Sequence, residues 1–276
     1  MKNTIVLFSV VVTVVLCIQL ICFRPSIDTN GKVLLNLTRN GNNGITIYDC
    51  SKKEFSNVSL EGLQAVFFKN DSVLLNQYDI ICEYNLNTEI SEIVYQGESF
   101  DYFAIRNNKQ LSLSKDNYIL LYDLKTKEKS VLTQDNGSKI HSWSKNGMLY
   151  YSDSDGKVKS VDLDSGEIKE VGIGYDPIIS EYNVAYKNKD TLIVKNIQTN
   201  DEYTYNGCAY SYCFSPTGKE LLVEDEMTIG TGIKNFFNQD IVIGHRLVIW
   251  DYANNKQNTI MDSCIATPNL ICDWQQ

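Results

Sequence analysis

Short apolar runs, separated by polar turns, recur along most of the chain. Examples are "ITIY" before Asp49, "YILLY" before Asp123 and "TLIVK" before Asn196. Such runs are rich in β-branched and aromatic residues, and Asp or Asn side chains that follow them stabilise turns by hydrogen-bonding the nearby backbone. The pattern predicts an all-β body of short strands joined by hairpin turns.

Two turn phrases alternate with these strands at a regular spacing. The first is an Asp or Asn with Ser, Thr or an equivalent a few positions later, and its copies begin at Asp49, Asn85, Asp123, Asp162, Asn196 and Asp251. Successive copies lie 34 to 39 residues apart, except for a last gap of 55. The second is an apolar or aromatic residue before a polar turn, with copies from Phe67, Ala104, Trp143, Ile179 and Phe214. Four strands in about 40 residues are typical of a β-propeller blade.

The C-terminal segment "ICDWQQ" resembles the second phrase, but its turn and the next strand are missing. They are found at the start of the body, where "TNGKVLLNLT" from Thr29 matches "PTGKELLVE" in a later repeat. We therefore expect the C-terminus to supply the innermost strand of a blade whose other three strands come from residues 32–60. The predicted fold class is an all-β six-bladed β-propeller over residues 30–276, closed by this shared blade. A β-sandwich or two small β domains are the alternatives.

One repeat carries a family resemblance. The segment "CFSPTGKELLV", from Cys213 to Val223, resembles the Ser-Pro-Asp-Gly repeat of TolB-like and WD-repeat-like propellers. The other repeats replace the Pro and the Asp, and the strict WD-repeat pair is reduced to an isolated "IWD" ending at Asp251. The resemblance implies a propeller architecture and identifies no functional residue.

The N-terminal segment follows a different pattern. From Thr4 to Cys22 the chain carries no charge, with Lys2 before this run and Arg24 after it. A run of this length fits a membrane-spanning helix or an export signal. No small-residue cleavage pattern follows it, so we expect a short tail (1–3), a hydrophobic helix that acts as an uncleaved signal anchor (4–23), a linker (24–29) and an extracytoplasmic propeller. A cleaved signal and a secreted protein are the alternative.

The net charge limits which partners are expected, and the cysteines raise the question of disulfides. The net charge is −9 and the sequence pI is about 4.8, whereas nucleic-acid binding needs clustered Lys and Arg, so no nucleic-acid partner is expected. Six cysteines lie in the body: Cys50, Cys82, Cys208, Cys213, Cys264 and Cys272. They can form disulfides in an exported domain, and Cys213 with Cys272 is one conceivable pair. Alternatively, several are small buried hydrophobic residues.

Two places stand out as candidate binding sites. The long gap places an insertion, residues 227–245, between the second and third strands of one repeat, and it contains the adjacent Phe236 and Phe237. Long loops on rigid scaffolds often bind partners, and exposed neighbouring phenylalanines cost free energy unless covered. His141 lies on a predicted innermost strand, where it could face the central channel; alternatively it is a buried structural histidine.

No motif in the chain indicates catalysis. The sequence lacks the nucleophile elbow, the zinc-protease motif and the Cys-x-x-Cys motif. Residues 151–162 partly match a calcium loop but begin with Tyr151, so we interpret them as a tight hairpin. We therefore assign no catalytic residue, metal ligand or cofactor.

The function that these features favour is that of a membrane-anchored, non-catalytic binding or sensor module, either alone or as part of a larger membrane complex. The alternative is a lyase, glycosidase or cyclase that uses the central funnel. His141, Asp101 and Glu181 would then be its candidate residues, because they lie near the innermost strands of consecutive blades.

Overall fold

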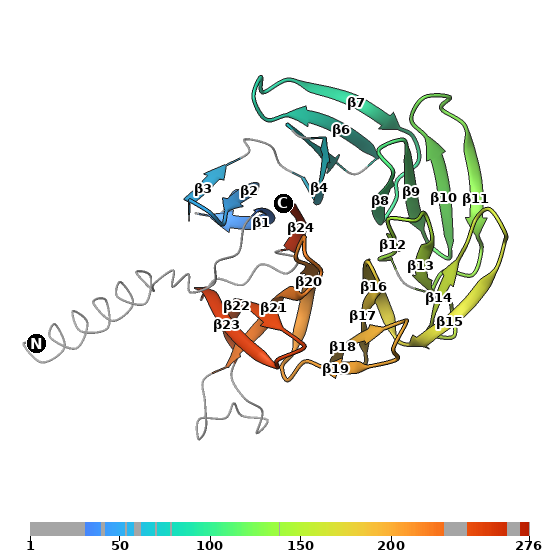
Figure 1. The fold of residues 1–276 in the computed structure, drawn as a ribbon. Helices are drawn as coiled ribbons and strands as arrows, with labels where there is room; N and C mark the ends of the chain where they lie inside the picture. Colours follow the sequence, from blue (N-terminus) through green and yellow to red (C-terminus); the bar gives the residue numbers. More distant parts are fainter. Residues whose placement is uncertain are drawn as a thin grey trace, which may run out of the picture.

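Six four-stranded antiparallel sheets form a ring in the computed structural model, each sheet being one blade of a propeller (Figure 1). The structure describes residues 31–39, 42–52, 54–57, 62–69, 71–77, 79–137, 139–228, 242–263 and 271–275. Within these residues no helix is long and apolar enough to cross a membrane. The predicted anchor, residues 4–23, lies outside them.

Each blade is built mostly from consecutive strands, with the first strand of the group innermost. Blade 1 contains β1 (Lys32–Arg39), β2 (Asn42–Asp49) and β3 (Glu54–Asn57). Blade 2 contains β4 (Gln64–Lys69), β5 (Ser72–Gln77), β6 (Ile80–Asn85) and β7 (Ser91–Gln96). Blade 3 contains β8 (Tyr102–Arg106), β9 (Gln110–Lys115), β10 (Tyr118–Asp123) and β11 (Lys129–Thr133).

The second half of the ring repeats this arrangement. Blade 4 contains β12 (Ser142–Trp143), β13 (Leu149–Ser152), β14 (Lys157–Val161) and β15 (Ile168–Ile173). Blade 5 contains β16 (Tyr175–Ser180), β17 (Asn183–Asn188), β18 (Thr191–Asn196) and β19 (Glu202–Thr204). Blade 6 contains β20 (Ala209–Phe214), β21 (Glu220–Thr228), β22 (Val242–Asp251) and β23 (Lys256–Ser263).

The C-terminal strand β24 (Ile271–Gln275) completes blade 1, which confirms the predicted shared blade. It pairs antiparallel with β1, placing Trp274 opposite Val33 and Asp273 opposite Leu34. The strand order in this sheet is β24, β1, β2, β3, so the C-terminal strand is innermost (Figure 1). A closed ring of blades leaves only short, protected sheet edges. The six-bladed propeller predicted from the repeats is therefore correct.

The turns between the third and fourth strands follow the predicted Asx geometry. The Oδ1 atom of Asp123 accepts hydrogen bonds from the N–H groups of Lys125 and Thr126, both at 2.9 Å. These backbone hydrogen bonds lower the pKa of Asp123. The Oδ1 atom of Asn196 makes the equivalent bonds to Gln198 and Thr199. The recurring Asp or Asn is thus explained by turn chemistry and not by ligand binding.

The hydrophobic core lies between neighbouring blades. Aromatic residues at the second repeat phrase fill it: Phe67, Phe103, Phe214 and Trp274 are buried, and Trp143 is partly buried. One core cluster joins Val33 and Trp274 of blade 1 to Leu222 of blade 6. Packing between the faces of neighbouring blades thus holds the ring together. The innermost strands surround the central axis.

Candidate functional site

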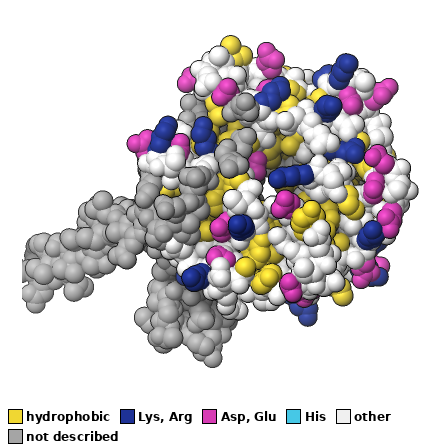
Figure 2. Space-filling view, viewed as in Figure 1, with side chains coloured by type: hydrophobic (Ala, Val, Ile, Leu, Met, Phe, Trp, Pro, Cys, Tyr) yellow, Lys and Arg dark blue, Asp and Glu magenta, His cyan; other side chains and the backbone are white. Residues whose placement is uncertain are grey.

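The six innermost strands surround a channel at the centre of the ring. Its cavity has a volume of about 360 Å³, and β4, β8, β16, β20 and β24 all contribute to its wall, together with residues 140–145 around β12. Figure 2 shows hydrophobic side chains near the middle of this face, next to charged side chains of both signs, which also extend over the outer part. The aromatic residues that line the cavity are Tyr102, Trp143, Tyr210, Tyr212, Phe214 and Trp274.

The size and lining of this channel match those of ligand-binding sites. Such sites have volumes of roughly 300–1,000 Å³ and apolar or aromatic walls with a few polar groups that set specificity. The polar groups of the channel include Gln64, Asp176 and Asp273. We therefore take the channel as the candidate functional site.

Two neighbouring innermost strands carry bulges at the same end of the channel. In β16 the pairing with β17 skips Asp176 and Pro177, and in β20 the pairing with β21 skips Tyr210. Asp176 has φ of +57° although it precedes a proline, a conformation that costs free energy. Bulges next to functional sites redirect side chains. Here they bring Asp176 and Tyr210 into the channel wall.

A hydrogen-bond network ties the two bulges together. The Lys187 ammonium donates to the Tyr210 carbonyl at 3.0 Å and lies 3.4 Å from the Asp176 carboxylate. The Tyr212 hydroxyl donates to the Asp176 carbonyl at 2.6 Å. Burial raises the pKa of Tyr212, so its hydroxyl remains a hydrogen-bond donor at neutral pH. The strained backbone at Asp176 is thus held by contacts from β17 and β20.

Asp273 places a carboxylate in the channel wall at the junction of blades 1 and 2. Its Oδ2 atom accepts a hydrogen bond from the Phe67 N–H at 2.9 Å, and its Oδ1 atom accepts one from the Trp274 N–H at 2.8 Å. Burial raises the pKa of this carboxyl, and the two backbone hydrogen bonds offset only part of that effect. No positively charged side chain of the described residues contributes to the shift.

His141 lies immediately before β12, and its side chain is fully buried in the channel wall. Its Nε2 atom is 2.7 Å from the Ser112 Oγ, and its Nδ1 atom is 3.3 Å from the Lys139 carbonyl. The Lys139 carbonyl oxygen can only accept a hydrogen bond, so Nδ1 must be the donor of that pair, and Nε2 then accepts from the Ser112 hydroxyl, to which the Trp143 indole N–H also donates at 2.8 Å. This assigns the hydrogen to Nδ1. Burial lowers the pKa of His141 to about 4, so the ring is neutral at pH 7.

The other predicted residues are not brought together with His141. Asp101 forms an ion pair with Lys139 at 3.0 Å, and Glu181 is exposed in the turn after β16, with φ of +53°. Of the three residues considered for a funnel enzyme, His141 is the one that lines the cavity. Phe236 and Phe237 lie outside the described residues. The two ends of the predicted insertion 227–245 are strand residues instead, because β21 extends to Thr228 and β22 begins at Val242; residues 229–241 between them lie outside the described part of the chain.

A polar cluster that sequence analysis missed lies at the base of this insertion. The Glu224 carboxylate is fully buried, accepts a hydrogen bond from the Ser211 Oγ at 2.5 Å and lies 2.8 Å from the His245 Nδ1. One strand position away, Arg246 contacts the Asp225 carboxylate at 2.6 Å. The sequence does contain a signal for this cluster: acidic residues near the end of β21 precede the insertion, and basic residues at the start of β22 follow it. These contacts join β21 to β22 close to the insertion.

The residues of the calcium-like segment stabilise two separate hairpins. The Asp153 carboxylate contacts Lys159 at 2.5 Å and accepts a hydrogen bond from the Lys157 N–H. The Asp162 carboxylate instead accepts hydrogen bonds from backbone N–H groups in the turn after β14. The two carboxylates therefore lie at opposite ends of β14, as in the hairpin interpretation.

The predicted pairing of Cys213 with Cys272 is not tested, because the side chain of Cys272 lies outside the described part of the chain. Cys264 lies outside it as well. Cys82 and Cys208 carry free thiols.

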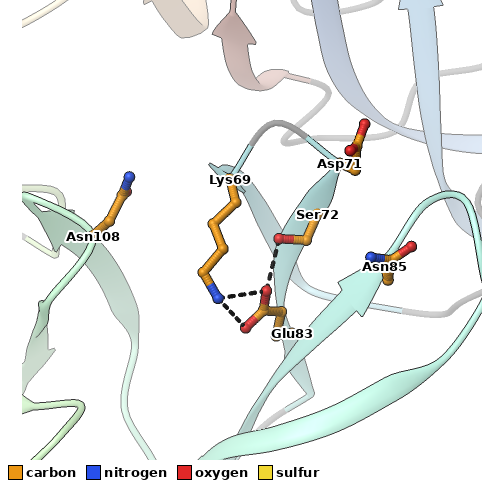
Figure 3. Close-up of a pocket in the computed structure, with 6 residues that line it drawn as sticks. All are labelled: Lys69, Asp71, Ser72, Glu83, Asn85 and Asn108. Carbon is orange, nitrogen blue, oxygen red and sulfur yellow. Dashed lines mark hydrogen bonds and ion pairs between the residues drawn. The ribbon is translucent and has the colours of Figure 1, made fainter.

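A second pocket, of about 400 Å³, lies between blades 2 and 3 (Figure 3). Lys69 and Glu83 form an ion pair at 2.9 Å, and the Ser72 hydroxyl donates to Glu83 at 2.9 Å. Asn108, from the turn between β8 and β9, lies across the gap from this pair (Figure 3). Since Lys69 and Ser72 both engage Glu83 within blade 2, we interpret this cluster as structural.

Comparison with known proteins shows the fold. No protein-family model matches the chain, and no curated protein does. TolB from Acinetobacter baumannii superposes with a TM-score of 0.68 at 13% identity, covering 88% of this chain and 66% of the TolB chain. This chain thus spans just under two thirds of TolB.

Two other solved structures are similar. An oligogalacturonate lyase from Vibrio parahaemolyticus has a TM-score of 0.54 at 10% identity, covering 86% of this chain and 75% of the lyase. A chain of the mitotic checkpoint complex has a TM-score of 0.52 at 14% identity, covering 86% of this chain and 78% of that one. The protein therefore has the propeller architecture of TolB-like and WD-repeat-like proteins, as the repeat resemblance implied.

Proposed function

We propose that this protein is a non-catalytic binding module, tethered to the extracytoplasmic side of a membrane, which takes a ligand or a segment of a partner protein into its central channel. The observation that carries the proposal is the cavity of about 360 Å³ that all six blades line with aromatic and polar side chains. A rigid ring suits this role, since a preformed site avoids the entropic cost of ordering loops on binding.

The contacts of the ionisable side chains in the channel favour binding over catalysis. A general acid or base needs a side chain that is free to exchange a proton with substrate. Both ring nitrogens of His141 are engaged within the protein, and Asp176 is paired with Lys187. Asp273 accepts hydrogen bonds from two backbone N–H groups. Each group holds the wall of the channel in place.

The membrane part of the proposal rests on the sequence. The uncharged run from Thr4 to Cys22 is long enough to span the hydrocarbon core, and the whole propeller follows it. A single anchor would keep the channel close to the membrane surface and raise the effective concentration of membrane-bound partners.

The experiment is to block the channel without disturbing the blades. Ala104 lines the cavity and is partly exposed, so Ala104→Trp fills space while leaving the core unchanged. The full chain and the variant, solubilised in detergent, are compared by quantitative cross-linking to membrane and extracytoplasmic fractions. A partner that cross-links to the original chain and is lost with A104W, at equal thermal stability, supports the proposal. Equal recovery with both chains excludes the channel as the binding site, and a matched deletion of residues 229–241 then tests the insertion.

A further inference from the structure

Among the described residues, Asp273 is a carboxylate of the channel wall that forms no ion pair. It lines the cavity and is partly exposed, and its two oxygens accept hydrogen bonds from the N–H groups of Phe67 and Trp274. Within the described residues it forms no ion pair, whereas Asp176, Asp153 and Asp225 each have a lysine or arginine partner. Buried charges in proteins are usually paired or bound to a cation. Asp273, which lines the channel, departs from this pattern within the described residues.

Lys145, the lysine that lines the channel, does not form an ion pair with Asp273. Lys145 lies in the turn after β12, and its side chain is exposed. Asp176, in contrast, lies near the start of β16, so the two residues mark opposite ends of the channel, and Asp273 lies within β24 between them. A ligand that enters past Asp176 thus meets one carboxylate at the mouth and a second, uncompensated one further inside.

Aromatic rings surround this path. The Tyr210 ring is 38% exposed at the Asp176 end, and its centroid lies 4.7 Å from that of His245. Its hydroxyl donates to Glu226, which keeps the ring in place. Tyr212 and Trp274 line the same cavity. Aromatic faces attract ammonium and guanidinium groups through their quadrupole, more strongly when water is excluded.

Acidic side chains outnumber basic ones near this mouth. Glu224, Asp225 and Glu226 follow one another on β21, beside the basic residues His245 and Arg246 on β22. Burial raises the pKa of the nearby Cys208 thiol, and the carboxylates of Glu226, Asp190 and Asp225 raise it further, while Lys187 acts in the opposite direction. A negative potential at the entrance raises the local concentration of cations and disfavours anions.

We propose that the channel binds an organic cation, an ammonium or guanidinium group on a small molecule or a peptide side chain, with its charge against Asp273 and its apolar part against Tyr210, Tyr212 and Trp274. The inference rests on the proposed function of the channel as a binding site and names the ligand class that it takes. Asp176 guides the cation at the mouth, and Asp273 is the residue that selects for positive charge.

The test uses two probes of nearly the same shape and different charge. N-acetyl-arginine amide carries a guanidinium group, and N-acetyl-citrulline amide carries a neutral urea group in its place. Each is titrated calorimetrically into the full chain in detergent at low and at physiological salt. We expect the arginine probe to bind with a Kd of about 0.1–1 mM, a range that suits a ligand of this size, and the citrulline probe at least about tenfold more weakly.

Three variants test which residues bind the arginine probe. Asp273→Asn keeps an oxygen for the Phe67 N–H and removes the charge, and it should weaken binding of the arginine probe to the level of the citrulline probe. Asp176→Asn should weaken it by about three- to tenfold through the loss of one charge at the mouth. Glu170→Gln, on the outer strand β15 and paired with Lys157, is the matched control and should bind like the original chain. Circular dichroism verifies that each variant is folded.

The outcomes separate this inference from the proposed function. Equal affinity for both probes, or unchanged binding of the arginine probe to D273N and D176N, overturns the cation inference but leaves the channel as a binding site. Binding of neither probe also overturns the inference, while the A104W cross-linking experiment decides separately on the channel. Binding of the arginine probe that is insensitive to A104W places the cation elsewhere and overturns the inference as well.

Discussion

The Asp273 carboxylate accepts a hydrogen bond from the backbone N–H of Phe67 at 2.9 Å, joining residues 206 positions apart. This bond links the C-terminal strand β24 of blade 1 to β4 of blade 2. Innermost strands of different blades share no β-ladder, so a side chain that reaches a neighbouring backbone group is one means by which the wall of the channel is held together.

The first prediction concerns this link. Asp273→Ala leaves the buried Phe67 N–H without an acceptor, so the free energy of unfolding should fall by about 1–3 kcal/mol, measured by urea denaturation. Asp273→Asn retains an acceptor and should cost less than the alanine variant. An alanine variant as stable as the original chain would show that the bond contributes nothing.

A second link of the same kind joins blades 2 and 3. The Gln64 amide donates to the Phe103 carbonyl at 2.8 Å and accepts from the Phe103 N–H at 3.1 Å. Gln64→Ala removes both bonds and should lower the free energy of unfolding by about 1–3 kcal/mol. Gln64→Glu keeps the acceptor and loses the donor, so its effect at neutral pH should exceed that of a surface change such as E170Q. Indistinguishable urea midpoints for all three variants would contradict this account.

Acid sensitivity should arise from His141. Its pKa is about 4 in the folded state, against 6.5 for an exposed histidine. The unfolded chain therefore binds the proton more tightly, and the stability that this residue contributes is present above pH 6.5 and lost as the pH falls to about 4. The loss should reach about 3 kcal/mol, at about 1.4 kcal/mol for each pKa unit.

The corresponding measurement is the free energy of unfolding between pH 4 and 7 for the original chain and for His141→Asn. The variant should be less stable at pH 7 because the contacts to Ser112 and Lys139 are lost, and its stability should depend less on pH over this range. Identical pH dependence in both chains would show that another group is responsible.

Membrane attachment gives a further prediction. The full chain should appear in the membrane fraction after cell lysis and remain there in high salt, because the hydrophobic segment and not surface charge holds it. Removal of residues 1–23 should release the propeller from the membrane. A full chain found entirely in the culture medium would support the cleaved-signal alternative.

The sequence was enough to predict the propeller architecture but not the side-chain contacts in the channel. The regular spacing of the six turn phrases, such as that of Asp123 from Asp162, predicted six blades. The match between the segments at Thr29 and Thr217 predicted the shared sheet. Both predictions were possible because turn chemistry and strand patterns are local. That Asp273 forms no ion pair within the described residues depends on which side chains meet across blades, and no local sequence pattern carries that information. His141 lines the cavity and is also buried, so both alternatives left open by the sequence describe part of its position; its contacts come from Ser112 and from Lys139.

The most direct test of the account removes the C-terminal strand and adds it back. A chain lacking residues 270–276 loses both the innermost strand of blade 1 and Asp273. It should unfold at lower urea concentration, aggregate through the exposed edge of β1, and no longer bind the arginine probe. A synthetic peptide of residues 267–276 should restore solubility and probe binding, and the same peptide with Asp273→Asn should restore solubility alone. A truncated chain that is as stable as the full one and binds the probe equally well would contradict the account.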